Sequence, residues 1–127
     1  MKDARLHDID TIIPIPLHKK KLSTRGYNQS EWFAKGLAQV LLKEMDVVSL
    51  ERTVETSTQT KKKKYERWEN VEHIFQLKHP QNLVNKHVLL VDDVITTGAT
   101  IEAAWQALKN VEGIRISVAS IAFARHV

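Results

Sequence analysis

The sequence contains no cysteine, which excludes disulfide bonds and thiolate metal sites. No apolar run approaches the roughly 20 residues that a membrane-spanning helix needs. The basic N-terminus is not followed by an apolar segment, so it does not have the form of a secretory signal. We therefore expect a soluble protein with no membrane association, located in the cytoplasm.

Glycine is also scarce, at 4 residues, and no Gly-x-Gly-x-x-Gly stretch occurs. That stretch is typical of the dinucleotide-binding turn of Rossmann domains, so a dinucleotide site is not favoured. The 6 histidines lack the close paired spacing of a zinc helix or finger. We expect them to be solvent-facing or locally hydrogen-bonded.

At 127 residues the chain has the length of one domain, and we expect a single core built from a sheet and a few helices. Apolar, β-branched runs predict strands over residues 9–15, 47–52, 71–77, 87–91 and 114–123. The run 87–91 is continuously apolar, which is typical of a strand covered on both faces. Strands that alternate with helices predict a mostly parallel α/β sheet.

Helical spacing of apolar residues predicts two helices. The first is expected from Asn28 to Glu44, with Asn28 as its cap and Glu31 returning the capping bond. The second is expected to end before Gly113. The expected inward stripes are Phe33, Leu37, Val40, Leu41 and Met45 on the first helix, and Ile101, Ala104, Trp105 and Leu108 on the second.

Asp92 and Asp93 directly follow the strand 87–91. In open α/β sheets, ligands bind beyond the carboxyl ends of the strands, so the position makes both residues site candidates. Carboxylates accept hydrogen bonds, and a vicinal diol offers two donors. Neighbouring side chains in a strand point to opposite faces, so we expect the chain to turn at this pair if both carboxylates serve one ligand.

The next residues, Thr96-Thr97-Gly98-Ala99-Thr100, have the chemistry of a phosphate-binding turn. Gly98 allows close backbone approach, and the N–H groups of the turn and of the helix start point toward one place. Three threonine hydroxyls add donors. The alternative is a plain strand–helix junction in which Thr100 is the N-cap.

Positive charge gathers in two segments, His18 to Lys21 with Arg25, and Lys61 to Lys64 with Arg67. Clustered charge of this kind indicates an anionic partner, either the phosphates of a small molecule or a nucleic acid; the alternative is a pair of solvated loops. The second cluster lies within residues 53–70, which are too polar to be buried and predict a long mobile loop.

Three segments resemble one family. VLLVDDVITTGAT resembles the phosphoribosyl pyrophosphate (PRPP) signature of type I phosphoribosyltransferases. IIPIPLHKKKLSTRGYNQS is similar to the pyrophosphate-loop region of the ComF-like competence proteins, and Thr58-Gln59 with Arg67, Asn70 and Phe75 is similar to the mobile-loop pattern of that group. The resemblance covers residues 10–125. It implies a type I phosphoribosyltransferase-like fold over one domain, residues 1–127.

Relatives in this family usually carry additional N-terminal sequence, often with a zinc-binding segment and part of a hood over the base site. The chain is therefore expected to be either a fragment or a short member of the family. This departure leaves recognition of the second substrate without assigned residues.

The resemblance also implies roles for individual residues. Asp92 and Asp93 would hold the ribose hydroxyls and, through the bound ribose, Mg²⁺. Thr96, Thr97, Gly98, Ala99 and Thr100 would hold the 5-phosphate. The residues expected at the pyrophosphate are Lys19, Lys20, Arg25, Lys63 and Arg67. Arg67 is the preferred catalytic cation beside the acidic pair, because a guanidinium can bind two phosphate oxygens at once.

The implied activity is that of a pentosyltransferase that uses PRPP and Mg²⁺ and passes the phosphoribosyl group to a nitrogenous acceptor. One alternative is a non-enzymatic member that senses a nucleotide or PRPP, or that assists DNA uptake by binding single-stranded DNA. A Rossmann-like domain with no phosphoribosyl ligand ranks last. Because many relatives pair, a homodimer is also among the expected assemblies.

Overall fold

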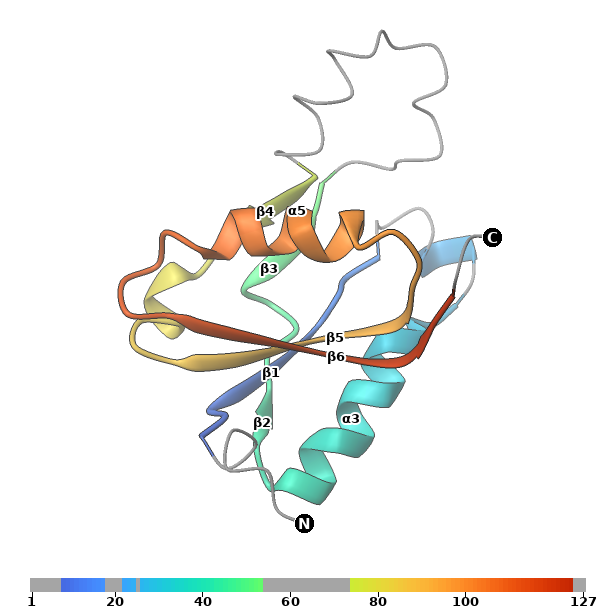
Figure 1. The fold of residues 1–127 in the computed structure, drawn as a ribbon, viewed down its shortest axis with the longest axis horizontal. Helices are drawn as coiled ribbons and strands as arrows, with labels where there is room; N and C mark the ends of the chain where they lie inside the picture. Colours follow the sequence, from blue (N-terminus) through green and yellow to red (C-terminus); the bar gives the residue numbers. More distant parts are fainter. Residues whose placement is uncertain (1–7, 18–21, 25, 54–73, 125–127) are drawn as a thin grey trace, which may run out of the picture.

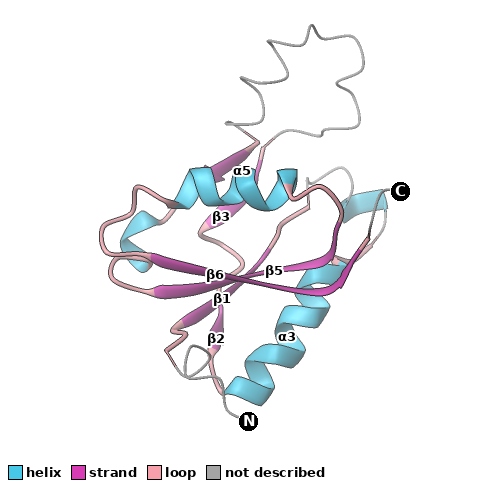
Figure 2. Ribbon diagram, viewed as in Figure 1, coloured by secondary structure: helices cyan, strands magenta, loops and turns pink. Residues whose placement is uncertain are grey.

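The computed structural model describes residues 8–17, 22–24, 26–53 and 74–124. Within them, a central sheet carries helix α3 (Gln29–Leu41) on one face, and helix α5 (Ala99–Leu108) with a small hairpin on the other (Figures 1 and 2). In the described part of the chain, no helix is both long and apolar enough to span a membrane.

The central sheet is parallel throughout, as the alternation of strands and helices predicts. Its strands are β1 (Thr11–Pro14), β2 (Glu44–Met45), β5 (His87–Ile95) and β6 (Arg115–Phe123), in the order β2-β1-β5-β6. Strand β2 was not predicted, because two residues are too few to show a periodicity. The order places β1 and β5 side by side at the centre, so the first basic segment and the threonine turn both follow central strands.

Two strands outside this sheet form the antiparallel hairpin β3 (Leu50–Arg52) and β4 (Phe75–Leu77). Strand β3 is shorter than the predicted strand 47–52, whereas the first residues of the predicted strand 71–77 lie outside the described residues. The prediction of a strand from residue 47 was wrong at its start, because Asp46 accepts hydrogen bonds from the N–H groups of Val48 and Ser49 and turns the chain there. The connection after β4 contains a 3₁₀ turn at Pro80–Asn82. The predicted mobile loop lies almost wholly outside the described residues.

Helix α3 begins where the sequence predicts, since Asn28 is its N-cap and accepts a hydrogen bond from Ser30 N–H at 3.0 Å. No return bond from Glu31 is present among the described residues. The helix ends before the predicted Glu44, because Leu42 adopts a left-handed conformation with φ of 57°. Val40 was wrongly placed in the inward stripe, since it is 80% exposed.

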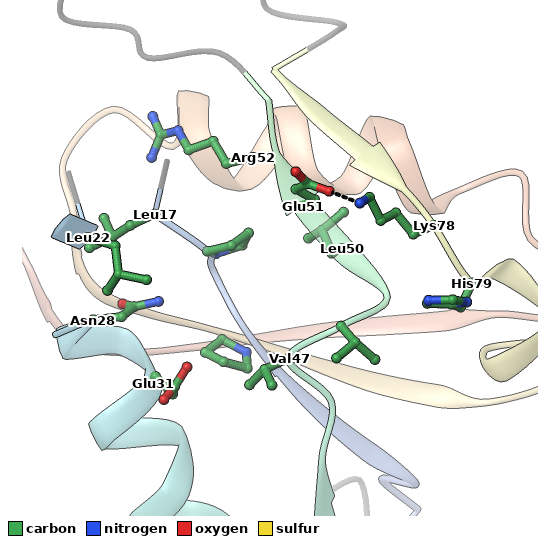
Figure 3. A pocket seen from close by; sticks show the side chains of 13 residues that line it. Leu17, Leu22, Asn28, Glu31, Val47, Leu50, Glu51, Arg52, Lys78 and His79 are labelled. Atoms are coloured by element: carbon green, nitrogen blue, oxygen red, sulfur yellow. Dashed lines mark ion pairs between the residues drawn. The ribbon is translucent and has the colours of Figure 1, made fainter. Parts of the chain in front are cut away.

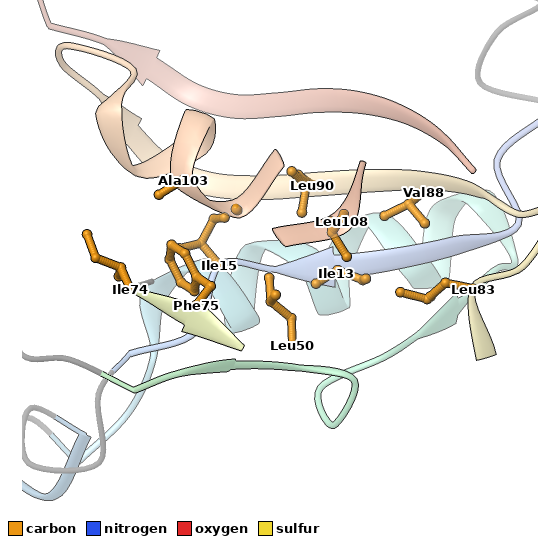
Figure 4. Close-up of a cluster of buried hydrophobic side chains, with 11 residues drawn as sticks. Ile13, Ile15, Leu50, Ile74, Phe75, Leu83, Val88, Leu90, Ala103 and Leu108 are labelled. Carbon is orange, nitrogen blue, oxygen red and sulfur yellow. The ribbon is translucent and has the colours of Figure 1, made fainter. Parts of the chain in front are cut away.

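The core lies on both faces of the sheet, and β5 contributes to each. Val88 and Leu90 pack under α5 and the hairpin (Figure 4), whereas Leu89 and Val91 pack under α3. All four side chains are buried, which confirms the prediction of a strand covered on both faces.

Helix α5 starts two residues earlier than the junction interpretation would place it, since its N-cap is Gly98 rather than Thr100. Ala104 and Leu108 are buried as predicted. Trp105 is 43% exposed and lies beneath the Lys109 ammonium, so its place in the buried stripe was predicted wrongly.

Candidate functional site

Strand β5 continues beyond the predicted end at residue 91 and includes both Asp92 and Asp93. Its pairing with β6 continues from Asp92 opposite Ser120 to Ile95 opposite Phe123. The turn that was expected at the pair if both carboxylates serve one ligand is not there, because both aspartates belong to the strand and the turn comes at residues 96–98. The pair follows the buried first five residues of β5 and precedes the turn that leads to α5.

The Asp92 carboxylate is held from two directions. Its Oδ1 accepts a hydrogen bond from the Ser30 hydroxyl at 3.2 Å and one from the N–H of Asp93 at 2.9 Å. Ser30 belongs to the first turn of α3 and is only 5% exposed. The carboxylate thus joins the start of α3 to the end of β5, although the two residues are 62 positions apart in the chain.

Asp93 lies close to Asp92 despite the alternation of a strand. Its Oδ1 accepts a hydrogen bond from the N–H of Val94 at 2.8 Å, so the side chain folds back along the backbone. Burial raises the pKa of Asp92, and a side-chain hydrogen bond and the negative charge of Asp93 raise it further, whereas the Ser30 hydroxyl lowers it. Two carboxyl groups that influence each other in this way suit a ligand with neighbouring hydroxyl donors.

The turn that follows β5 encloses a small cavity of about 30 Å³. Gly98 has a φ of 83°, a conformation that L side chains rarely adopt, and no atom lies within 4 Å of the position that a Cβ would take. The backbone conformation thus favours glycine at this position. The lining residues are Asp92, Val94, Ile95, Thr96, Thr97, Gly98, Ala99, Thr100 and Ile101.

Backbone donors remain free at this turn. The N–H of Ala99 donates to Thr97 Oγ1 at 3.3 Å, a long bond within the loop. Within the described part of the chain, no acceptor engages the N–H groups of Gly98, Thr100 and Ile101. These groups lie at the N-terminus of α5, where the helix dipole favours negative charge. The turn can therefore bind an anion such as a phosphate.

A larger cavity of about 380 Å³ lies on the β1 side (Figure 3). It is bounded by the end of β1, the start of α3, the segment after β2, and the β3–β4 hairpin. The lining residues are Pro14, Pro16, Leu17, Leu22, Asn28, Glu31, Val47, Val48, Leu50, Glu51, Arg52, Lys78 and His79. The Lys78 ammonium pairs with the Glu51 carboxylate at 2.5 Å, so these two charges balance each other.

Arg52 connects this cavity electrostatically to the acidic pair. Burial lowers the pKa of Arg52, and the negative charge of Asp92 raises it. The guanidinium remains charged, since its ordinary pKa is far above neutrality. Arg52 extends from β3 toward the side of the cavity lined by Leu17 and Leu22, which flank the first basic segment (Figure 3).

The structure brings together six of the predicted site residues around the small cavity: Asp92, Thr96, Thr97, Gly98, Ala99 and Thr100. Asp93 is adjacent to Asp92 but does not line that cavity. The predicted pyrophosphate-binding cations all lie outside the described residues: Lys19, Lys20, Arg25, Lys63 and Arg67.

Two residues of the site were missed by sequence reasoning, Ser30 and Arg52. Ser30 closes the segment that resembles the pyrophosphate-loop region, but no role was expected for it, and the tertiary contact with Asp92 identifies it. Arg52 ends the predicted strand 47–52 and precedes the polar loop that carries the second basic cluster, but this position does not indicate its interaction with Asp92. No local sequence pattern predicts either interaction with Asp92.

The described residues contain no group of three or more histidine, cysteine, aspartate or glutamate side chains that could hold a metal ion. The acidic pair offers carboxylate oxygens, which are the ligand type that Mg²⁺ prefers. Two carboxylates suit a Mg²⁺ ion that takes its remaining ligands from water and from a substrate.

Comparison with known families matches residues 28–126 to the phosphoribosyl transferase domain. The sequence is 34% identical to competence protein F of Haemophilus influenzae, over 91% of this chain and 54% of that protein. It is 33% identical to competence protein ComFC of Bacillus subtilis, over 90% of this chain and 44% of that protein. It is 35% identical to the DNA utilization protein YhgH of Escherichia coli O157:H7, over 80% of this chain and 44% of that protein. The chain thus spans about half the length of these relatives.

Among solved structures, the fold is similar to that of a purine phosphoribosyltransferase from Pyrococcus horikoshii. The TM-score is 0.52 at 19% identity, and the match covers 94% of this chain and 64% of the other. This similarity confirms the predicted fold class. The names of the sequence relatives agree with the ComF-like resemblance of the basic segment and the mobile-loop pattern.

Proposed function

The chain belongs to the phosphoribosyl transferase domain family, and from this premise we propose that it binds PRPP with Mg²⁺ and transfers the phosphoribosyl group to a nitrogenous acceptor. The observation that carries the proposal is the position of Asp92 on the wall of the same small cavity that the Thr96–Thr100 turn encloses. A diol acceptor and an anion-binding turn then adjoin each other, as the sugar and phosphate of one ribose 5-phosphate group require.

In this proposal the turn binds the 5-phosphate. The free N–H groups of Gly98, Thr100 and Ile101 donate to its oxygens, and the threonine hydroxyls add further donors. Asp92 and Asp93 accept hydrogen bonds from the ribose hydroxyls. Because Asp92 already holds a fixed orientation, the sugar is positioned without reordering of the carboxylate.

Pyrophosphate leaves from C1 of the sugar, through a transition state with oxocarbenium character. Negative charge grows on the leaving oxygens, so cations placed there lower the barrier. Among the described cations, Arg52 is proposed for this task, because Arg52 and Asp92 interact electrostatically. Lys19, Lys20, Arg25, Lys63 and Arg67 are proposed for the same task, with Arg67 as the principal one.

Mg²⁺ fits this donor set as an ion shared between protein and substrate. One or two carboxylates together with substrate oxygens are its usual environment, and Asp92 with Asp93 would hold the ion indirectly, through the bound ribose. When bound, Mg²⁺ would neutralise charge on the departing pyrophosphate. The protein's own residues would orient the sugar and hold the phosphate.

The direct test replaces the acidic pair with isosteric amides, Asp92→Asn with Asp93→Asn. We expect PRPP with Mg²⁺ to raise the thermal unfolding temperature of the wild type, since a ligand at 100 times its Kd stabilises a protein by about 2.7 kcal/mol. The double variant should lose this response. Equal stabilisation of both proteins would refute the assignment of the sugar to these residues.

The alternative role in DNA uptake draws on the names of the relatives and on the two basic segments, which lie outside the described residues. Binding of single-stranded DNA should then weaken steeply as salt is raised, and weaken further when Lys61 to Lys64 are replaced by alanine. Binding that is absent or independent of salt would refute it. The homodimer and the cytoplasmic location likewise remain proposals.

A further inference from the structure

We infer that Ser30 is a positioning residue for Asp92, and that its buried hydroxyl orients the carboxylate for the ribose. The inference rests on the proposed function of the acidic pair and assigns to it Ser30, the last residue of the segment that resembles the pyrophosphate-loop region, for which no role was expected. Ser30 lies on α3, which packs on one face of the central sheet. Helix α5, which follows the phosphate-binding turn, packs on the other face.

Ser30 is itself held in place by the start of α3. Its N–H donates to Asn28 Oδ1 at 3.0 Å, and Asn28 Nδ2 donates to the carbonyl of Ile15 at 3.1 Å. Asn28 therefore fastens the first turn of the helix to the end of β1. Because the backbone at Ser30 is held in place, its hydroxyl can hold a contacted group in one orientation.

The contact that it makes is with Asp92. Ser30 Oγ and the N–H of Asp93 both donate to Oδ1 of Asp92, at 3.2 and 2.9 Å. Two donors on one oxygen determine the rotation of the carboxylate, and Oδ2 is the oxygen that carries neither bond. Oδ2 is then the acceptor offered to a ribose hydroxyl.

The burial of Ser30 makes its hydrogen bond to Asp92 significant. A hydroxyl removed from water without a partner costs free energy, and Ser30 is 5% exposed. In the described part of the chain, Asp92 is the acceptor that its hydroxyl uses. A donor at this point also favours the charged carboxylate, against the effect of burial.

The chain offers a matched control in a second buried serine. Ser49 is 0% exposed, and its hydroxyl donates to Asp46 Oδ2. This pair lies between β2 and β3, and neither residue lines the small cavity. Ser30→Ala and Ser49→Ala therefore each remove a buried serine–aspartate bond, one at the proposed ribose and one away from it, and Ser49→Ala also removes the bond that Ser49 Oγ accepts from Asn82 Nδ2 at 3.3 Å.

The experiment is a calorimetric titration of wild type, Ser30→Ala and Ser49→Ala with ribose 5-phosphate and, separately, with inorganic phosphate. Loss of one hydrogen-bond contribution should raise the Kd of Ser30→Ala for ribose 5-phosphate by roughly three- to tenfold. Its Kd for phosphate should stay within about twofold, because the turn at Gly98 does not contact Ser30. Ser49→Ala should bind both ligands as the wild type does.

Each other outcome overturns a specific statement. If the wild type binds ribose 5-phosphate and Ser30→Ala binds it equally well, the positioning role is wrong while the proposed function stands. If Ser30→Ala weakens both ligands alike, or if Ser49→Ala matches it, the serine acts through general stability and the inference fails. If the wild type binds phosphate but gains nothing from the ribose, the proposed function itself fails.

Discussion

At the scale of single residues, the site places function and stability in opposition. Asp92 is held among buried groups and beside a second carboxylate, and both effects raise its pKa. A diol-binding role needs it to be available as an acceptor at neutral pH. The Ser30 hydroxyl and the N–H of Asp93 favour the charged form and partly offset the unfavourable environment.

This opposition predicts a pH-dependent gain in stability from Asp92→Asn. A native pKa above the unfolded value near 3.8 gives stability that is fully present below that pH and lost as pH rises through the native pKa. The asparagine side chain does not ionise, so the Asp92→Asn variant does not lose this stability as pH rises. The unligated variant should exceed the wild type in free energy of unfolding at pH 7 by on the order of 0.5 kcal/mol after solvent screening.

Urea unfolding of both proteins at pH 3.5 and pH 7 checks this prediction, with the sign set by linkage. The advantage of the variant should shrink toward zero at the lower pH. A variant that is less stable than the wild type at pH 7, or an advantage that does not change with pH, would show that the ionised Asp92 is not a source of instability.

The acidic pair and the threonine turn were predictable because their chemistry is contained in one short run of sequence. Ser30 was not, since its contact with Asp92 joins residues 62 positions apart. Arg52 was not predictable either, because its electrostatic interaction with Asp92 depends on the packing of β3 beside the sheet. Sequence patterns report local periodicity and turn chemistry, and both residues lack such a signal.

At the scale of elements, the strand–turn–helix unit β5–α5 carries the phosphate-binding groups. The strand supplies rigidity from its buried half, and the turn at Gly98 brings free N–H groups to the start of α5. The strand continues two residues beyond the acidic pair. The sequence did not predict this extension, because the composition of these residues does not distinguish the end of a strand from the start of a turn. The turn itself was placed correctly.

Two glycine substitutions test the role of this turn. Gly98→Ala should destabilise the protein by about 1–2 kcal/mol, because a Cβ is strained at φ of 83° even though space is available for it. It should also weaken phosphate binding, since relaxing the strain redirects the N–H groups. Gly36→Ala is the control, with ordinary helical backbone and open space, and it should stabilise α3 by roughly 0.5–1 kcal/mol.

Urea unfolding and a phosphate titration of each variant provide the measurements. Gly98→Ala with wild-type stability and wild-type phosphate affinity would mean that the left-handed turn is not needed. A loss of phosphate binding in Gly36→Ala would mean that the effect is not local to the turn.

At the scale of the whole molecule, the sheet separates two hydrophobic clusters that share β1 and β5. One lies under α5 and the β3–β4 hairpin, and the other under α3. The parallel α/β architecture follows from the alternation of elements in the sequence. The position of the hairpin outside the sheet does not, because short strands give no information about their partners.

The shared strands predict that the molecule unfolds as one cooperative unit. Leu89 and Leu90 are neighbours on β5 that pack into opposite clusters, at 3% and 0% exposure. Each alanine substitution should cost about 2–5 kcal/mol. In both variants the unfolding midpoints from far-UV circular dichroism and tryptophan fluorescence should coincide. Separate midpoints in either variant would show that the two clusters fold independently.

The central claim is that the acidic pair and the threonine turn form one site for a phosphate and the diol attached to it. Calorimetric titration with ribose 5-phosphate and with 2-deoxyribose 5-phosphate, both with Mg²⁺ present, tests it most directly. Removing one hydroxyl that donates to a charged carboxylate should weaken binding roughly tenfold or more, and Asp92→Asn should abolish this difference. Equal affinity of the wild-type protein for the two sugars would contradict the claim.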